Sequence, residues 1–370
     1  AARRISDTSG AMKNHCRRMP GWLRLATLWA LLLAGRAEAA RQVSLIYGSD
    51  DRTEPYAAAP LERAMARSTF ALFDSDDVVA DTETAGLVHL RTKPFTTTIV
   101  FHPPDYMVAV EEPLCKSERF YGQPRGAFCT GFLVGPDLLV TAGHCVLDHP
   151  GGARQFCRQV AFVADYGYYD KASDPTLTDS SKIYRCRRVI AAAHKPGTIG
   201  KPDWALIRLS RPVDPRRRPP FDIDRGALPK VGSPVLMIGY PKGLPVKIAA
   251  GARVTKTGDG VFYADLDAYK GNSGSPALGR DGVVEGILVS YGTFGLGDFV
   301  MAPPAAGAEP CWKSELIPDA EGSGFAVSSI KNLAARIPPL RPAQKRRFRP
   351  DRRSLRLLGG FSEPGQWPAD

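Results

Sequence analysis

Three short segments carry side chains that together could perform acyl transfer. "LLVTAGHCV" places His144 just after an apolar run, "KPDWALIRL" places Asp203 just before another, and "GNSGSP" places Ser273 between glycines. A serine hydroxyl is a weak nucleophile at neutral pH, so it needs a base to take its proton and a third group to orient that base. The chain order His, Asp, Ser is one in which such triads occur.

Each motif taken alone has an ordinary structural explanation. A histidine beside a cysteine often only packs, and an aspartate after a proline often caps a turn. Their joint occurrence in this order favours a catalytic site. With Gly271 two residues before Ser273, the backbone N–H groups of both could point into one space that holds an oxyanion. A simple turn glycine is the alternative.

The elements that must position these residues are mostly strands. Between about residues 85 and 335, short β-branched and aromatic runs alternate with Gly, Pro and Asp. The clearest helical pattern comes late, in "SSIKNLAARI" at 328–337. The joint "SRPVDPRRRPPFDIDRGALPK" divides the strands into two sets of similar size. We therefore expect an all-β fold with two barrel-like halves.

Together, "TAGHC", "PDWALIRLSRPV" and "GNSGSP" resemble the histidine, aspartate and serine motifs of the chymotrypsin/trypsin-like serine peptidases. The resemblance spans roughly residues 95–337. It implies two six-stranded antiparallel β-barrels with a C-terminal helix, and the triad His144, Asp203 and Ser273 in the cleft between them. It also implies an oxyanion hole formed by Gly271 and Ser273.

The residue before the serine departs from trypsin. Trypsin and its close relatives have an aspartate there, which a newly released N-terminal amine neutralises, whereas this chain has Asn272. Asparagine cannot form that ion pair. In this respect "GNSGSP" resembles the bacterial branch that includes the glutamyl endopeptidases, and we do not expect activation by a buried N-terminus.

The resemblance also assigns a specificity pocket. It places Asp267 at the base of the pocket and "VSYG", with Ser290, Tyr291 and Gly292, in one wall. A carboxylate at the base would select lysine or arginine in the substrate. Val289 stands where the glutamyl endopeptidases carry a histidine, so glutamate specificity is not expected.

Two other readings of Asp267 stay open. A difference of one residue in the loop path would put Asp265 in the pocket instead, or neither acid. Asp267 could also pair with Lys270 or with backbone groups.

The cysteines indicate disulfides. Apart from Cys16 there are six, an even set that is typical of an oxidising compartment. The resemblance implies that Cys129 and Cys145 staple the histidine loop. Cys157 and Cys186 flank strands that we expect to form a hairpin, which leaves Cys115 for Cys311. The chain has no CxxC pair and no nucleotide-binding loop, so we expect neither a metal site nor a cofactor.

The ends of the chain differ in composition from its centre. Residues 1–39 read as upstream sequence and a cleaved signal peptide, which predicts a secreted or periplasmic protein. Residues 40–94 read as an N-terminal extension or a propeptide, and 95–340 as the peptidase domain, with barrel one reaching to about 215 and barrel two covering about 228–337. Residues 341–370 form a basic tail that either binds an anionic surface or is simply solvated.

These observations predict a secreted serine endopeptidase that acts on proteins or peptides through an acyl-enzyme and cleaves after basic residues. Two alternatives use the same fold. One is a catalytically silent binding or adhesion protein, and the other is an esterase. The complete set of catalytic residue types argues against the first, because nothing in the fold requires them together.

Overall fold

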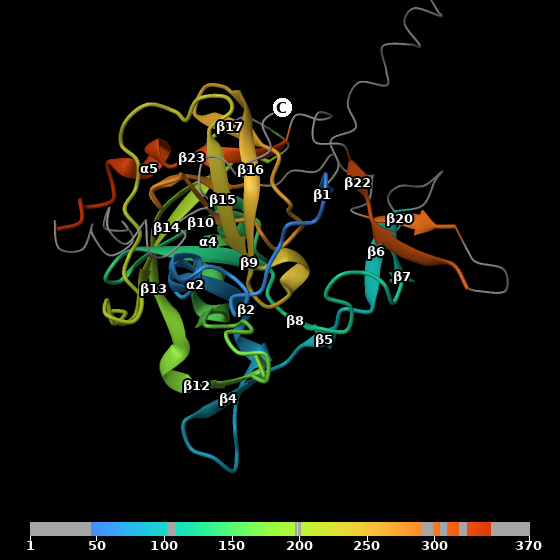
Figure 1. Ribbon diagram of the computed structural model, residues 1–370. Coiled ribbons are helices and arrows are strands. Elements are labelled where there is room, and N and C mark those ends of the chain that lie inside the picture. Colours follow the sequence, from blue (N-terminus) through green and yellow to red (C-terminus); the bar gives the residue numbers. More distant parts are fainter. Residues whose placement is uncertain are drawn as a thin grey trace, which may run out of the picture. The chain divides into compact units, whose positions relative to one another are not determined.

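The computed structural model describes residues 46–101, 109–196, 198, 201–289, 299–303, 309–317 and 324–341. Two closed barrels of six antiparallel strands dominate it (Figure 1). This confirms the all-β, two-barrel prediction.

Barrel one closes in the order β10-β14-β13-β11-β2-β9. Its core is aromatic and aliphatic, and Phe70, Phe132, Phe162 and Ile207 are each 0% exposed. Large apolar side chains from several strands are therefore buried in this barrel. The strands are β2 (Thr69–Asp74), β9 (Cys129–Gly135), β10 (Leu138–Thr141), β11 (Val160–Ala164), β13 (Ile183–Ala193) and β14 (Trp204–Leu209).

Barrel two closes in the order β15-β16-β17-β23-β19-β18. Its strands are β15 (Pro234–Gly239), β16 (Lys247–Thr257), β17 (Val261–Ala264), β18 (Pro276–Leu278), β19 (Val284–Leu288) and β23 (Phe325–Ser329). The C-terminal helix follows as α5 (Lys331–Ala334), which is shorter than the helical pattern at 328–337 suggested.

The start of barrel one differs from the prediction. The sequence placed the peptidase domain from residue 95, but β2 lies at Thr69–Asp74, inside the segment assigned to an extension or propeptide. Strand β2 pairs with β9 on one side and with β11 on the other. Without it the barrel would be open, so this part of the segment belongs to the domain. The helix α2 (Pro60–Ala66) leads directly into it.

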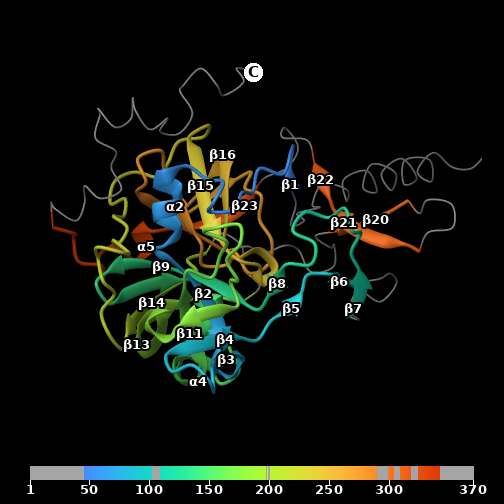
Figure 2. The same cartoon turned by 60° about the horizontal axis from the view of Figure 1, so that its bottom comes forward.

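Smaller elements surround the barrels. In both views the hairpins β6-β7 and β20-β21 lie together at one side (Figure 2). The sheets are β1 (Ile46–Tyr47) with β22 (Leu316–Ile317), β3 (Val78–Ala80) with β4 (Leu87–Leu90) and β12 (Leu177–Asp179), β5 (Lys93–Pro94) with β8 (Pro124–Arg125), β6 (Thr97–Phe101) with β7 (Ala109–Pro113), and β20 (Phe299–Ala302) with β21 (Cys311–Ser314). The remaining helices are α3 (Gly143–Leu147), α4 (Gly152–Gln159), η1 (Ser75–Asp77), η2 (Ser180–Lys182) and η3 (Pro241–Gly243).

All three predicted disulfides are present. Cys129–Cys145 joins β9 to α3, and Cys157–Cys186 joins α4 to β13. Cys115–Cys311 spans 196 residues and ties the chain after β7 to β21. A cross-link that closes so long a loop removes much freedom from the unfolded chain.

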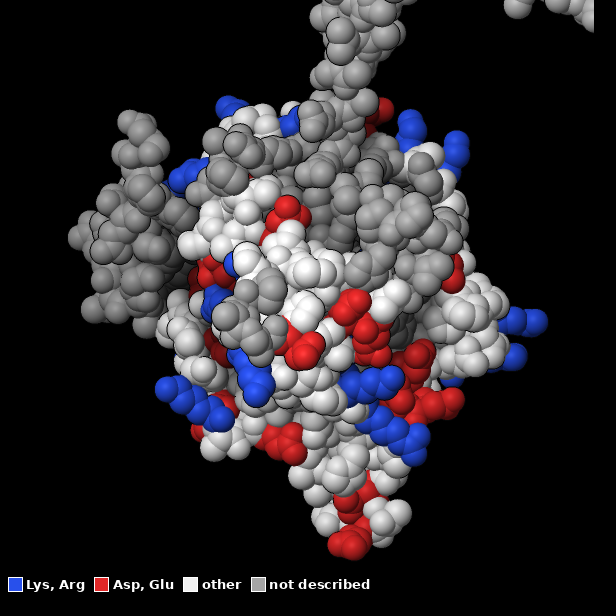
Figure 3. Space-filling view, turned by 90° about the vertical axis from the view of Figure 1, so that its right-hand side faces the viewer, with Lys and Arg blue, Asp and Glu red and all other residues white. Residues whose placement is uncertain are grey.

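Several predictions concern residues outside the described part of the chain. These are the signal peptide at 1–39, the basic tail beyond Arg341, and the pocket wall at 290–292. Within the described residues, no helix has the length and apolar character needed to cross a membrane. The face in Figure 3 carries acidic and basic side chains side by side, so the described residues there form no patch of a single charge.

Candidate active site

His144 is held by a short helix that follows strand β10. The helix α3 begins at Gly143, one residue before it, and Cys145, one residue after it, is bonded to Cys129 of β9. The side chain of His144 is 18% exposed. The disulfide therefore fixes the backbone of the histidine to the barrel wall while its ring keeps access to solvent.

Asp203 lies directly before β14 and is bonded to His144 through both carboxylate oxygens. Oδ2 lies 2.8 Å from His144 Nδ1, and Oδ1 accepts a hydrogen bond of 3.0 Å from the backbone N–H of His144. This arrangement places the ring hydrogen on Nδ1, so Nε2 is the ring nitrogen that can act as a base.

The Asp203 carboxyl is 4% exposed. Burial alone would raise its pKa, but the hydrogen bond from His144 and the nearby histidine charges outweigh burial and hold the pKa below its ordinary value. Asp203 is therefore an ionised carboxylate in the neutral range, as an orienting group must be.

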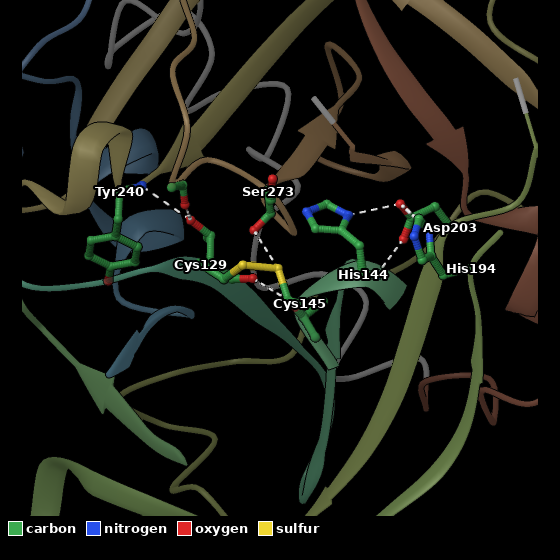
Figure 4. Close-up of a disulfide and its surroundings, with 10 residues drawn as sticks. Cys129, His144, Cys145, His194, Asp203, Tyr240 and Ser273 are labelled. Atoms are coloured by element: carbon green, nitrogen blue, oxygen red, sulfur yellow. Dashed lines mark hydrogen bonds and ion pairs between the residues drawn. A yellow bond between two sulfur atoms is a disulfide. The ribbon is translucent and has the colours of Figure 1, made fainter. Parts of the chain in front are cut away.

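Ser273 lies in the turn between β17 and β18. Strand β9 of barrel one forms hydrogen bonds with the backbone of this turn. The N–H of Thr130 in β9 donates to the carbonyl of Ser273 at 2.8 Å. The Thr130 hydroxyl donates to the carbonyl of Gly271, also at 2.8 Å. In Figure 4 the imidazole of His144 lies between Ser273 and Asp203. The structure therefore brings the three residues predicted as the triad together.

Gly271 adopts a backbone conformation that other residues rarely use. Its φ is +99°, and a Cβ atom there would lie 2.4 Å from the carbonyl oxygen of Tyr240. Among the described residues, no acceptor is bonded to the N–H of Gly271 or of Ser273. These two donors are thus available for a developing oxyanion.

Asp267 is engaged by the N-terminal segment. Its Oδ1 accepts a hydrogen bond from the N–H of Tyr47, and its Oδ2 accepts one from the N–H of Asp51, both at 2.8 Å. The residue is 4% exposed. Of the three readings left open by the sequence, pairing with backbone groups is the one this geometry matches, although the partners lie near the start of the described chain, far from Asp267 in the sequence.

The carboxyl groups of Asp51 and Asp267 face each other. Burial, followed by the charge of Asp51, raises the pKa of Asp267 to about 8, and burial also raises the pKa of Asp51. Asp51 in turn accepts a hydrogen bond from the N–H of Gly251 in β16. The pair therefore shares a proton near neutral pH, which links the N-terminal segment to barrel two.

Of the other residues that the sequence analysis discussed for the pocket, some are described by the structure and some lie outside its described residues. Asp265 accepts a hydrogen bond from the N–H of Arg253, in the strand pair β16-β17, and Lys270 is exposed. Val289 is 3% exposed and packs in the core. Ser290, Tyr291 and Gly292 lie outside the described residues.

A cleft of about 690 Å³ opens beside His144 and the Cys129–Cys145 disulfide. Its lining is partly apolar, with Phe128 and Pro150, and partly acidic. The acidic members are Asp74, Asp76, Asp77 and Asp148. This space adjoins His144, which is one of its lining residues.

Two groups of side chains have the residue types of a metal site. One combines His144 with Cys129 and Cys145, whose sulfurs form a disulfide and so offer no thiolate. The other consists of His144, His194 and Asp203, whose ligand atoms lie within 4.8 Å of one another. These atoms already bond to each other, so a metal ion there would displace the contacts of the triad.

The sequence did not point to three contributors to this site. Thr130 anchors the serine turn, the segment with Tyr47 and Asp51 binds Asp267, and His194 contacts Asp203. Thr130, Tyr47 and Asp51 lie far in the sequence from the residues that they bind, so no local motif indicates these contacts. Only the His194 and Asp203 pair, at the two ends of "HKPGTIGKPD", had a local signal that could have been used.

The shared proton of Asp51 and Asp267 predicts a pH-dependent effect of Asp51→Asn. A raised carboxyl pKa stabilises the fold below about pH 4, and this contribution is lost as pH rises through about 8. Asp51→Asn removes the second negative charge, so its gain in unfolding free energy relative to wild type should be larger at pH 9 than at pH 6, by about 1 kcal/mol.

Urea unfolding followed by tryptophan fluorescence at both pH values measures this difference. Asp259→Asn is a suitable control, because Asp259 is exposed and outside the pair. Equal effects of Asp51→Asn at pH 6 and pH 9 would contradict the shared proton.

One family model matches part of this chain. Residues 129–287 match the family model described as "Trypsin-like peptidase domain". The comparison with curated proteins found no match.

Three solved structures are similar to this chain, each at low sequence identity. A Glu endopeptidase in complex with MPD is 15% identical, over 68% of this chain and 90% of its own, with a TM-score of 0.40. The scabies mite inactivated protease paralogue S-I1 is 15% identical, over 77% and 95%, with a TM-score of 0.42. Neuropsin, a serine protease expressed in the limbic system of mouse brain, is 16% identical, over 57% and 87%, with a TM-score of 0.38.

The family model covers the histidine, aspartate and serine motifs and five of the six strands of barrel one. Residues 129–287 of this chain are therefore similar to a trypsin-like peptidase domain.

Proposed function

We propose that this protein is a serine endopeptidase. His144 Nε2 takes the hydroxyl proton of Ser273 while Ser273 Oγ bonds to the carbonyl carbon of the substrate. His144 then gives that proton to the leaving amine as the C–N bond breaks, which leaves an acyl-enzyme. Water, deprotonated by His144 in the same way, releases the acid and restores Ser273.

The observation that carries this proposal is the bonding of Asp203. Each of its oxygens accepts a hydrogen bond from His144, and the carboxylate is almost completely buried. An ionised carboxylate in such a place stabilises the imidazolium that forms each time His144 takes a proton. No packing requirement of a β-barrel explains a buried charge at this position.

The surroundings support the remaining steps. The available N–H groups of Gly271 and Ser273 would stabilise the tetrahedral oxyanion. The cleft beside His144 gives the leaving part of a peptide room to bind. We therefore propose proteins or peptides as substrates. Three disulfides are typical of proteins in oxidising compartments, which supports the proposal that the chain acts outside the cytosol.

The main prediction concerns the nucleophile. Ser273→Ala should abolish labelling by a fluorophosphonate probe and reduce peptide cleavage by about 10⁵-fold or more, because no other group takes over the acyl transfer. Gel fluorescence and a diverse peptide library measure the two effects. Ser210→Ala is the control, because Ser210 is exposed. Equal labelling of both variants would refute the assignment.

Gly271→Ala tests the oxyanion site. The new Cβ would meet the Tyr240 carbonyl, so the turn must shift and its N–H groups must turn away. We expect kcat to fall by about 10²-fold or more. Gly86→Ala is a matched control, because Gly86 has a φ of +90° but no atom within 4 Å of the added Cβ. An active Gly271→Ala variant would exclude this role.

Asp267→Ser distinguishes a structural role of the Asp267 carboxylate from a role in substrate selection. Because Asp267 binds the backbone at Tyr47 and Asp51, we expect a loss of about 1–3 kcal/mol in unfolding free energy and an unchanged cleavage preference. Peptide-library profiling and urea unfolding of the same samples measure both. Selective loss of cleavage after lysine and arginine would instead favour the basic-specificity pocket predicted from the sequence.

A further inference from the structure

A second histidine contacts the carboxylate of the triad. His194 Nδ1 lies 3.2 Å from Asp203 Oδ2, the same oxygen that is bonded to His144. The side chain of His194 is 2% exposed. In Figure 4, Ser273, His144 and then Asp203 with His194 follow one another across the site.

The strand pairing explains why His194 and Asp203 meet. Strand β13 ends at Ala193 and β14 begins at Trp204, and these two residues are paired in the antiparallel register. The next residue on each strand is therefore His194 on one side and Asp203 on the other. The hairpin places an imidazole and a carboxylate opposite each other without any contribution from the rest of the site.

The other nitrogen of His194 also faces a carboxylate. Nε2 lies 3.2 Å from Asp148 Oδ2, and Asp148 directly follows α3, the helix that carries His144. The contacts thus form a closed ring from His144 through Asp203, His194 and Asp148 back to α3. Gly143 permits it, because a Cβ there would lie 2.1 Å from the Ala193 carbonyl oxygen.

This arrangement favours a cationic ring at His194. A neutral imidazole has only one N–H, so one nitrogen would direct its lone pair at a carboxylate. With hydrogens on both nitrogens, each contact becomes a charge-assisted hydrogen bond. The groups that face His194 among the described residues are Asp203, Asp148 and the ring of His144, whose centroid lies 5.8 Å away.

We propose that His194 is a positioning residue of the triad: it holds Asp203 Oδ2 in place for His144 and supplies a positive charge behind the carboxylate. This inference rests on the peptidase function proposed above. A positive charge at His194 repels a second positive charge on the ring of His144. Asp148 keeps His194 in the required orientation.

The test is the pH dependence of the reaction of each variant with a fluorophosphonate, which needs no contact in the cleft beside His144. In His194→Asn we expect the rate constant to fall roughly ten- to a hundredfold, because Asp203 is held less precisely. We also expect the acid limb of the profile to move to higher pH by about half a unit to one unit, because the positive charge is gone.

If His194→Asn does not fold, Asp148→Asn replaces it in the test. The Asp148 side chain is 51% exposed, so its substitution should leave the fold intact. It should lower the rate in the same direction, by less. His89→Asn is the matched control, since His89 also pairs with an aspartate, Asp81, but its side chain is 52% exposed. Its rate and profile should equal those of wild type.

The outcomes separate this inference from the proposed function. Wild type that reacts, with both His194→Asn and Asp148→Asn behaving like His89→Asn, overturns the role of His194 and leaves the peptidase proposal intact. Slower reaction of His194→Asn with an unshifted acid limb also overturns it, since a purely structural loss would do the same. Wild type that fails to react at any pH overturns both proposals.

Discussion

The buried charge of Asp203 is the constraint on which the rest of the structure depends. The Asp203 carboxyl is 4% exposed, and burial disfavours its ionised form. Hydrogen bonds or nearby positive charges must therefore stabilise the carboxylate. The backbone N–H and the ring of His144 donate hydrogen bonds to it, and His194 Nδ1 lies 3.2 Å from its Oδ2. The N–H of Asp203 donates to the hydroxyl of Ser328 in β23, which ties the same residue to barrel two.

The serine turn is positioned by a second set of contacts between the barrels. Thr130 of β9 binds the carbonyls of Gly271 and Ser273, and its hydroxyl oxygen accepts from the N–H of Tyr240. The Cys129–Cys145 disulfide lies directly beside these contacts. His144 and Ser273 are therefore both fixed to β9, although they belong to different barrels.

Much of this could be predicted from local patterns, and the failures have a physical cause. The triad motifs, the barrel strands and the Cys129–Cys145 and Cys157–Cys186 disulfides carry signals in short stretches of sequence, whereas Cys115–Cys311 follows only from the cysteines that these two pairs leave over. Strand β2 was assigned to an extension because its partner β9 begins far downstream of the point where β2 ends, and such pairing leaves no local mark. The resemblance places Asp267 in a pocket, and its bonding to the backbone of Tyr47 and Asp51 has no local signal because these residues lie far upstream, before the first strand of barrel one.

The most direct test of the account is the activity of Asp203→Asn. The amide keeps the size of the side chain, but it cannot hold His144 in the required tautomer or stabilise the imidazolium. We expect kcat to fall by about 10³- to 10⁴-fold, with the protein still folded and Ser273 still present. A variant that keeps wild-type kcat would contradict the account, because the buried carboxylate would then have no catalytic role.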